Sequence, residues 1–175
     1  MAVYALGDAT PQIHPDAFVH PDATVIGNVV IGAESTVWPQ TVLRGDYGRI
    51  EIGARTSVQD GTVIHAGPGF PTLVGSDCVI GHLVHLEGCI LEDGCLVGSG
   101  SVVLHHAVVG SRATVAANAV VPNRMAVPED ALAVGVPATL RLGASHPEII
   151  RIAVGEYVDN GRRYRQGLVP VEQPD

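Results

Sequence analysis

Residues 95–121, CLVGSGSVVLHHAVVGSRATVAANAVV, decide the fold of this chain. A small residue stands at every sixth position of this stretch, and a valine follows two positions later. The pairs are Cys95 and Val97, Ser101 and Val103, Ala107 and Val109, Ala113 and Val115, and Ala119 and Val121. Two residues of a strand that have one other residue between them point to the same side of the strand. Each group of six therefore supplies one small and one large inward side chain, followed by a turn.

The same period extends toward the N-terminus with three interruptions. The large positions there are Ile13, Val19, Val25, Ile31, Val37, Leu43, Ile52, Val58, Ile64, Val74, Ile80, Leu86 and Leu91. A period of six with Gly at many turns is typical of a hexapeptide β-helix, in which three groups of six form one triangular coil. A β-sandwich would instead show strands at roughly 8–12-residue spacing without a fixed period. The eighteen large positions predict about six coils.

The small inward column also contains all three cysteines, Cys78, Cys89 and Cys95. Buried thiols at such positions act as small core residues, so we expect neither a nucleophile nor a metal ligand among them. Three cysteines in a chain of this size do not form a disulfide scaffold either.

The pattern changes near residue 145, where Ser145-His146-Pro147-Glu148 fits a helix capping box. Apolar residues then recur at helical spacing and predict a helix of about 14 residues that packs on the β-helix. They are Ile149, Ile150, Ala153, Val154, Tyr157 and Val158. The basic segment Arg162–Arg165 is predicted to be a solvated end or a subunit contact. We expect one domain, with the β-helix and its exit segment over 1–144 and the helix and tail over 145–175.

Composition excludes several classes of protein. Aromatic residues are only 4% of the 175 residues, and 21 Gly with 12 Pro disfavour a helix bundle. A net charge of −8 argues against nucleic-acid binding, which needs a basic surface. No apolar run approaches the roughly 18–20 residues that span a bilayer, and the first residues lack a basic signal-peptide start. We therefore expect no membrane contact and a cytoplasmic location.

The three interruptions of the period all follow the same corner of the predicted triangle, here the third. The residues just after the large positions of that corner are Arg44, His65 and Glu87, so they should stack at about 4.8 Å. Asp60 and His82 follow the second corner instead. The two corners are roughly 15–20 Å apart at ~3.3 Å per residue. A site that uses both sets must therefore lie between subunits, which implies a closed cyclic oligomer.

Four of these side chains point to a metal at that interface. His65, His82, His85 and Glu87 converge there, because His85 points outward two residues before Glu87. Zinc accepts either three histidines or two histidines with a carboxylate. The remaining histidines are predicted to be solvated surface residues, namely His14, His20, His105, His106 and His146. Arg44 and Asp46 alone would fit a structural ion pair.

The same residues carry a family resemblance. LRGD at 43–46, SVQDG at 57–61, His65, IGH at 80–82 and EGC at 87–89 resemble the γ-class carbonic anhydrases and their hexapeptide-repeat relatives. The resemblance implies a left-handed parallel β-helix, with one C-terminal helix, that assembles as a homotrimer with a metal between subunits. It assigns two metal-binding histidines to His65 and His82.

The third family histidine falls at Glu87, so either Glu87 or His85 is the predicted third ligand. The resemblance further implies catalytic roles for Arg44, Asp46, Gln59 and Asp60. Residues 66–71 lack the acids of the family's proton-shuttle loop.

The sequence therefore predicts a metal-dependent lyase, a carbonic anhydrase that hydrates CO₂ to bicarbonate with a metal-bound hydroxide. Zinc is the expected metal, and iron or cobalt fit the same ligands. Alternatives remain open, because fold alone does not decide function. One is a hexapeptide-repeat acyltransferase, with His105 or His106 as its base. Another is a metal-dependent thioester hydrolase. A third is a catalytically silent trimeric binding protein.

Overall fold

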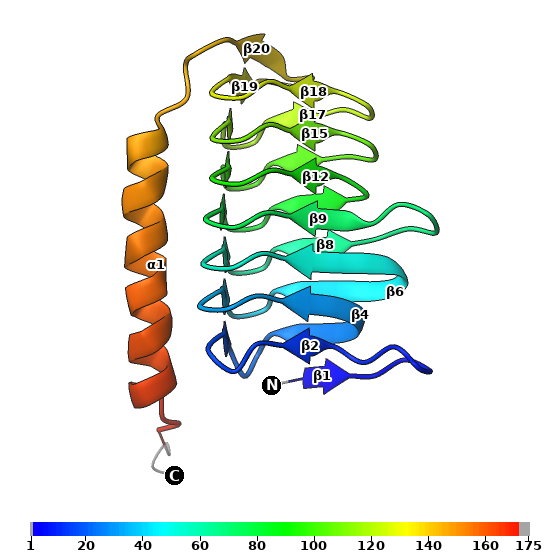
Figure 1. Cartoon of the computed structure of the whole chain (residues 1–175), viewed down its shortest axis with the longest axis vertical. Helices are drawn as coiled ribbons and strands as arrows, with labels where there is room; N and C mark the ends of the chain where they lie inside the picture. Colours follow the sequence, from blue (N-terminus) through cyan, green and yellow to red (C-terminus); the bar gives the residue numbers. More distant parts are fainter. Residues whose placement is uncertain (1, 172–175) are drawn as a thin grey trace.

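The computed structural model describes residues 2–171 and shows a parallel β-helix with one long helix along its side (Figure 1). The predicted fold class is confirmed. The β-helix has seven coils rather than six, because three strands extend the stack beyond the predicted positions, Ala2–Tyr4 before Ile13, and Ala126–Val127 and Leu132–Val134 after Val121. Residues 172–175 of the predicted tail lie outside the described residues.

Three faces make up the triangle. Face A consists of β3 (Phe18–Val19), β5 (Thr36–Val37), β7 (Ser57–Val58), β10 (Val79–Ile80), β13 (Leu96–Val97), β16 (Thr114–Val115) and β19 (Leu132–Val134). Face B consists of β1 (Ala2–Tyr4), the first halves of β4 (Thr24–Ile31) and β6 (Val42–Ile52), β8 (Val63–His65), β11 (His85–Glu87), β14 (Val102–Val103) and β17 (Val120–Val121). Face C consists of β2 (Gln12–Ile13), the second halves of β4 and β6, β9 (Thr72–Val74), β12 (Ile90–Leu91), β15 (Val108–Val109) and β18 (Ala126–Val127).

The chain runs from face A through face B to face C in each coil. We call the turn between faces A and B the AB corner and the turn between faces B and C the BC corner. These are the second and third corners of the sequence analysis. The last strand, β20 (Thr139–Arg141), pairs antiparallel with β19 and ends the stack.

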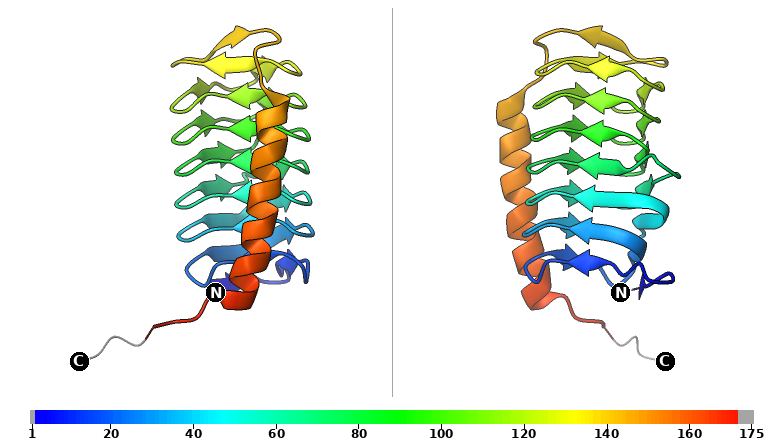
Figure 2. Two further views of the ribbon diagram at one scale, coloured as in Figure 1. Left: turned by 90° about the vertical axis from the view of Figure 1, so that its left-hand side faces the viewer. Right: turned by 45° about the vertical axis from the view of Figure 1, so that its right-hand side comes forward.

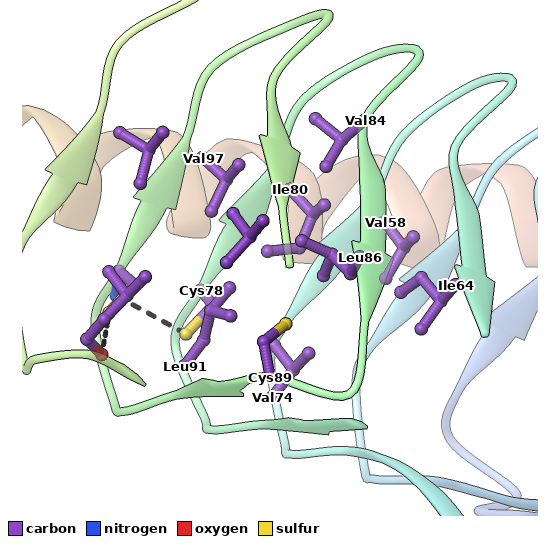
Figure 3. Close-up of a cluster of buried hydrophobic side chains, with 14 of the residues drawn as sticks. Val58, Ile64, Val74, Cys78, Ile80, Val84, Leu86, Cys89, Leu91 and Val97 are labelled. Atoms are coloured by element: carbon purple, nitrogen blue, oxygen red, sulfur yellow. Dashed lines mark hydrogen bonds between the residues drawn. The ribbon is translucent and has the colours of Figure 1, made fainter. Parts of the chain in front are cut away.

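In-register stacking builds the core. Val58 pairs with Ile80, and Ile80 pairs with Val97 in the next coil, so that aliphatic side chains form a continuous column (Figure 3). The three cysteines are buried in this core, as predicted. Burial raises the pKa of the Cys89 thiol to about 12. Contact with Cys78 and burial raise the pKa of Cys95 as well, so these thiols stay protonated.

Close approach of successive turns requires glycine at some corners. A Cβ at Gly53 would lie 2.5 Å from the carbonyl carbon of Gly75 in the next coil. No side chain fits at that distance unless the coils separate. The glycine therefore sets the spacing at which the backbone hydrogen bonds form.

The helix is longer than predicted and begins without the predicted cap. Helix α1 (Pro147–Gly167) has 21 residues, its N-cap is His146, and no side chain caps it. The Ser145 hydroxyl donates instead to the Arg112 carbonyl oxygen at 2.6 Å and contacts the Thr114 hydroxyl at 2.8 Å. The capping-box prediction is thus wrong, because tertiary contacts use the hydroxyl. Proline in the first turn is confirmed.

Helix α1 runs down face A from the last coil to the first (Figure 2). Ile150, Val154 and Val158 are buried, whereas Ile149, which was predicted to pack, is exposed. The extra turns contain the basic segment Arg162–Arg165, for which a solvated end or a subunit contact was predicted. Tyr164 packs edge-on against Trp38, with ring centroids 5.0 Å apart, and Arg162 pairs with Glu34 at 2.5 Å. This end of the helix is therefore fastened to the first coils.

Gly53→Ala is expected to lower the free energy of unfolding by about 1–3 kcal/mol, because the added methyl forces two coils apart. Gly155→Ala is the control, since a Cβ at Gly155 has no atom within 4 Å. That helical substitution should raise stability by up to about 1 kcal/mol. Urea unfolding followed by circular dichroism measures both; equal stability of the two variants would contradict the steric account.

A second pair of variants tests the helix contact. Ile150 is 3% exposed and Ile152 is 57% exposed on the same helix. Ile150→Ala should cost about 2–5 kcal/mol through the cavity it leaves, and Ile152→Ala less than about 0.5 kcal/mol. Thermal unfolding compares them directly. A similar shift for both variants would mean that the helix is not packed on face A as described.

Candidate functional site

The BC corner carries the stack predicted from the sequence. Arg44 lies opposite His65 in the register of β6 and β8, and His65 lies opposite Glu87 in that of β8 and β11. His65 Nε2 is 2.8 Å from an Asp46 oxygen, and His65 Nδ1 is 2.8 Å from a Glu87 oxygen. Arg44 forms an ion pair with the other oxygen of Asp46. Each ring nitrogen of His65 thus lies within hydrogen-bond distance of one carboxylate oxygen.

Glu87 is the centre of this cluster. Besides His65, it contacts His85 Nε2 at 3.3 Å, and His105 Nε2 lies 3.6 Å from the same oxygen that His65 uses. His85 thus reaches the region where the sequence placed it. His105 was assigned to solvent, and this prediction is wrong. His105 lies over Gly88, the residue after Glu87, in the next coil, and this position at the same corner was the signal that could have found it.

Opposing effects set the acidity of the two carboxylates. Hydrogen bonding from His65 lowers the pKa of Glu87 below its ordinary value against the effect of burial, with help from His105 and His85. Burial acts to raise the pKa of Asp46, but hydrogen bonds from His65 and Arg44 together lower it further than burial raises it. Both carboxyl groups are therefore ionised near neutral pH.

The loop that joins β8 to β9 projects beyond the other turns of its edge (Figure 1). Its Phe70 ring lies 4.5 Å from the ring of His106 and 5.9 Å from that of His105, measured between centroids. A shallow pocket lies beneath this loop. It is lined by Gly69, Phe70, Pro71, Gly88, Ile90, His106, Ala107 and Val108.

The AB corner carries a separate pair. His82 Nδ1 is 3.0 Å from an Asp60 carboxylate oxygen. The Leu83 N–H donates to the Asp60 carbonyl at 2.9 Å, and the Gly100 N–H donates to the His82 carbonyl at 2.8 Å. These backbone bonds fix the pair on successive coils. His82 is half exposed, and the buried Gln59 precedes Asp60 on the same turn.

One chain therefore does not bring all the predicted site residues together. Arg44, Asp46, His65, His85 and Glu87 meet at the BC corner, and Gln59, Asp60 and His82 meet at the AB corner. Across residues 2–171, no group of three or more His, Cys, Asp or Glu side chains is arranged to hold a metal ion. A metal shared between subunits stays a prediction.

No helix in the described part of the chain is long and apolar enough to cross a membrane.

Comparisons with known proteins point to transferases. The family model described as bacterial transferase hexapeptide (six repeats) matches residues 10–45, 71–105 and 88–123, slightly more than half of the chain. The carnitine operon protein CaiE of Escherichia coli O157:H7 is 43% identical over 98 residues, which make up 56% of this chain and 50% of CaiE. The chain thus matches about half the length of its curated relatives.

Two solved structures match over nearly their whole length. A hexapeptide transferase family protein from Anaplasma phagocytophilum is 30% identical, with a TM-score of 0.89 and coverage of 93% of this chain and 98% of that one. A putative acetyltransferase from Bacillus cereus is 32% identical, with a TM-score of 0.91 and coverage of 94% and 97%.

These relatives overturn the predicted carbonic anhydrase function. Proteins described as transferases match more than nine-tenths of the chain, so the predicted lyase activity is wrong, and none of these relatives supports zinc. The resemblance rested on a β-helix and on corner motifs that the carbonic anhydrases share with their hexapeptide-repeat relatives. Glu87, which stands where the third histidine of the anhydrases falls, is the position at which this chain differs from them. The chain belongs to the hexapeptide-repeat family of bacterial transferases.

Proposed function

We propose that this protein is an acyltransferase that moves an acyl group from a coenzyme A thioester to an amine or hydroxyl acceptor. The full-length similarity to a putative acetyltransferase supports this class of reaction. The observation that carries the proposal is the Asp60–His82 pair at the AB corner.

Orientation makes His82 the best general base of the described residues. Asp60 holds Nδ1 at 3.0 Å, which fixes the ring and its tautomer. Nε2 makes no hydrogen bond to any part of the chain between residues 2 and 171, so it is free to accept a proton. His65 differs, because carboxylates hold both of its nitrogens. His106, an alternative from the sequence, packs against Phe70 and has no carboxylate contact among the described residues.

The chemistry follows from that free nitrogen. His82 Nε2 takes the proton of the acceptor N–H or O–H as the acceptor atom attacks the thioester carbonyl carbon. The tetrahedral adduct then collapses, the carbon–sulfur bond breaks and the acyl group stays on the acceptor. The leaving thiolate receives the proton from His82, so the base is restored.

A homotrimer is part of the same proposal. One row on the outward side of face B consists of Val42, Val63, His85, Val102 and Val120, so this row is apolar apart from His85, and Val63 is 39% exposed. Three copies with face B turned inward would bring the AB corner of one subunit to the BC corner of the next. His82 would then face the charged cluster around Glu87.

The predicted divalent metal belongs to this arrangement. Histidine nitrogens and a carboxylate are donors that suit zinc, iron or cobalt, so His65, Glu87 or His85, and His82 of a neighbouring subunit would hold it. A bound metal would polarise a carbonyl group. Because Asp60 holds Nδ1, a metal on His82 would occupy Nε2, so the proton transfer by His82 described above takes place in the metal-free site.

His82→Asn should lower kcat for acyl transfer by about 10²–10⁴, and Asp60→Asn should lower it by a smaller factor, because the ring loses its orientation. His14→Asn is the matched control, since His14 is an exposed histidine beside Asp16 far from both corners. Thiol release from acetyl coenzyme A, measured with a panel of primary amines and alcohols, gives the rates. Full activity of the His82 variant would reject this base.

Val63→Asp should convert a species of three times 18.2 kDa into single chains, because it places a charge on the apolar side of face B. Ile152→Asp changes an apolar residue that is 57% exposed on the outer side of helix α1 and should leave the mass unchanged. Sedimentation velocity distinguishes the two. A Val63 variant that keeps the wild-type mass would show that face B is not the subunit contact.

A further inference from the structure

Leu83 has a backbone conformation that does not suit it. Its φ is +57°, in the left-handed region. Nine other non-glycine residues in the described part of the chain have positive φ, and all are polar or charged. They are Glu34, Gln40, Arg55, Asp77, His106, Arg112, Asn118, Arg124 and Asp130. A bulky apolar residue in this region is an outlier that calls for an explanation.

The packing of Leu83 does not supply that explanation. The residue is 71% exposed. Its side chain lies beside Gly61, where a Cβ would be 2.7 Å from Leu83 Cδ2. The side chain thus covers a glycine, and little of its apolar surface is buried. A single exposed leucine is ordinary. An exposed leucine in a strained backbone conformation, however, costs free energy without burying apolar surface in return.

Leu83 lies beside the proposed base at the AB corner. It directly follows His82, and its N–H donates to the carbonyl of Asp60, so the left-handed turn fixes it beside the proposed base. The next coil of this corner carries only Gly98, Ser99 and Gly100, and in the coil after it Asn118 lies over Gly100, with its Oδ1 in the space that a Cβ of Gly100 would take. The AB corner is therefore open directly beside His82, with Leu83 as its apolar wall and Asn118 as a polar boundary farther along the stack.

We propose that Leu83 is a specificity-determining residue that packs against the aliphatic part of the acyl group on the thioester donor. This inference rests on the proposed acyl transfer at His82. An apolar side chain next to the base holds a short aliphatic acyl chain and keeps water away from the thioester carbonyl. The expected donor class is a short-chain aliphatic acyl thioester, such as acetyl or butyryl coenzyme A.

Two variants of Leu83 test this role. Leu83→Asn suits the left-handed turn and should raise Tm by about 2–4 °C, while KM for butyryl coenzyme A rises about tenfold and kcat changes less than threefold. Leu83→Gly opens the corner and should shift the ratio of kcat/KM for hexanoyl over acetyl coenzyme A by at least tenfold. Leu142→Asn is the control, because Leu142 is 75% exposed at the far end of the β-helix and should change neither quantity.

Binding decides the matter independently of turnover. Calorimetry should show that Leu83→Asn weakens binding of butyryl coenzyme A about tenfold and leaves binding of free coenzyme A unchanged. Equal affinities of the variant and the wild type for butyryl coenzyme A would overturn the role of Leu83. So would loss of the oligomer in sedimentation with unchanged acyl preference, which would assign Leu83 to the subunit contact.

The proposed acyl transfer fails in a different way. It fails if the wild type and the Leu142 variant release no thiol with any acceptor, or if His82→Asn is fully active. Absence of any coenzyme A ester binding by the wild type overturns both proposals. Binding that depends on Leu83 without turnover supports the acyl contact and rejects only the reaction.

Discussion

In-register stacking of coils is the constraint on which the rest of this structure depends. Each strand between the two end coils forms backbone hydrogen bonds with the coils on either side, and its inward side chains extend columns such as that of Val58, Ile80 and Val97. A single coil cannot bury its own aliphatic residues, so each coil is stable only between neighbours. The spacing of the coils is thereby fixed along the whole axis. Small departures, such as a side chain in place of Gly53, act on the complete stack.

The stack leaves the corners free to carry chemistry. Corner side chains point away from the core, so charged and polar residues there do not disturb the columns. The BC and AB corners differ in the side chains that they carry. At the BC corner Glu87 gathers His65, His85 and His105, and its low pKa keeps it ionised among them. At the AB corner one carboxylate orients one histidine and leaves a ring nitrogen available.

Departures from local preference identify the parts of the chain that serve a neighbour or a ligand. Ser145 gives up its capping position because its hydroxyl fastens the exit segment to the last coils, and helix α1 continues without a side-chain cap. The helix is stabilised by face A instead, through Ile150 and the aromatic contacts of Tyr164. Leu83 is the opposite case, because it has a strained conformation and is 71% exposed.

The sequence by itself determined the β-helix, the buried cysteines, the C-terminal helix and the stacking of Arg44, His65 and Glu87, because a period of six assigns each residue to a face and a corner. The register of the strands confirmed that assignment. The prediction of carbonic anhydrase activity was wrong, because proteins that use the same fold for other reactions share these corner motifs. Only the tertiary structure showed that His105 joins Glu87, that the basic segment extends the helix, and that the nitrogens of His65 and His82 differ in availability. These features depend on side-chain directions between coils about eighteen residues apart, which a repeat pattern does not specify.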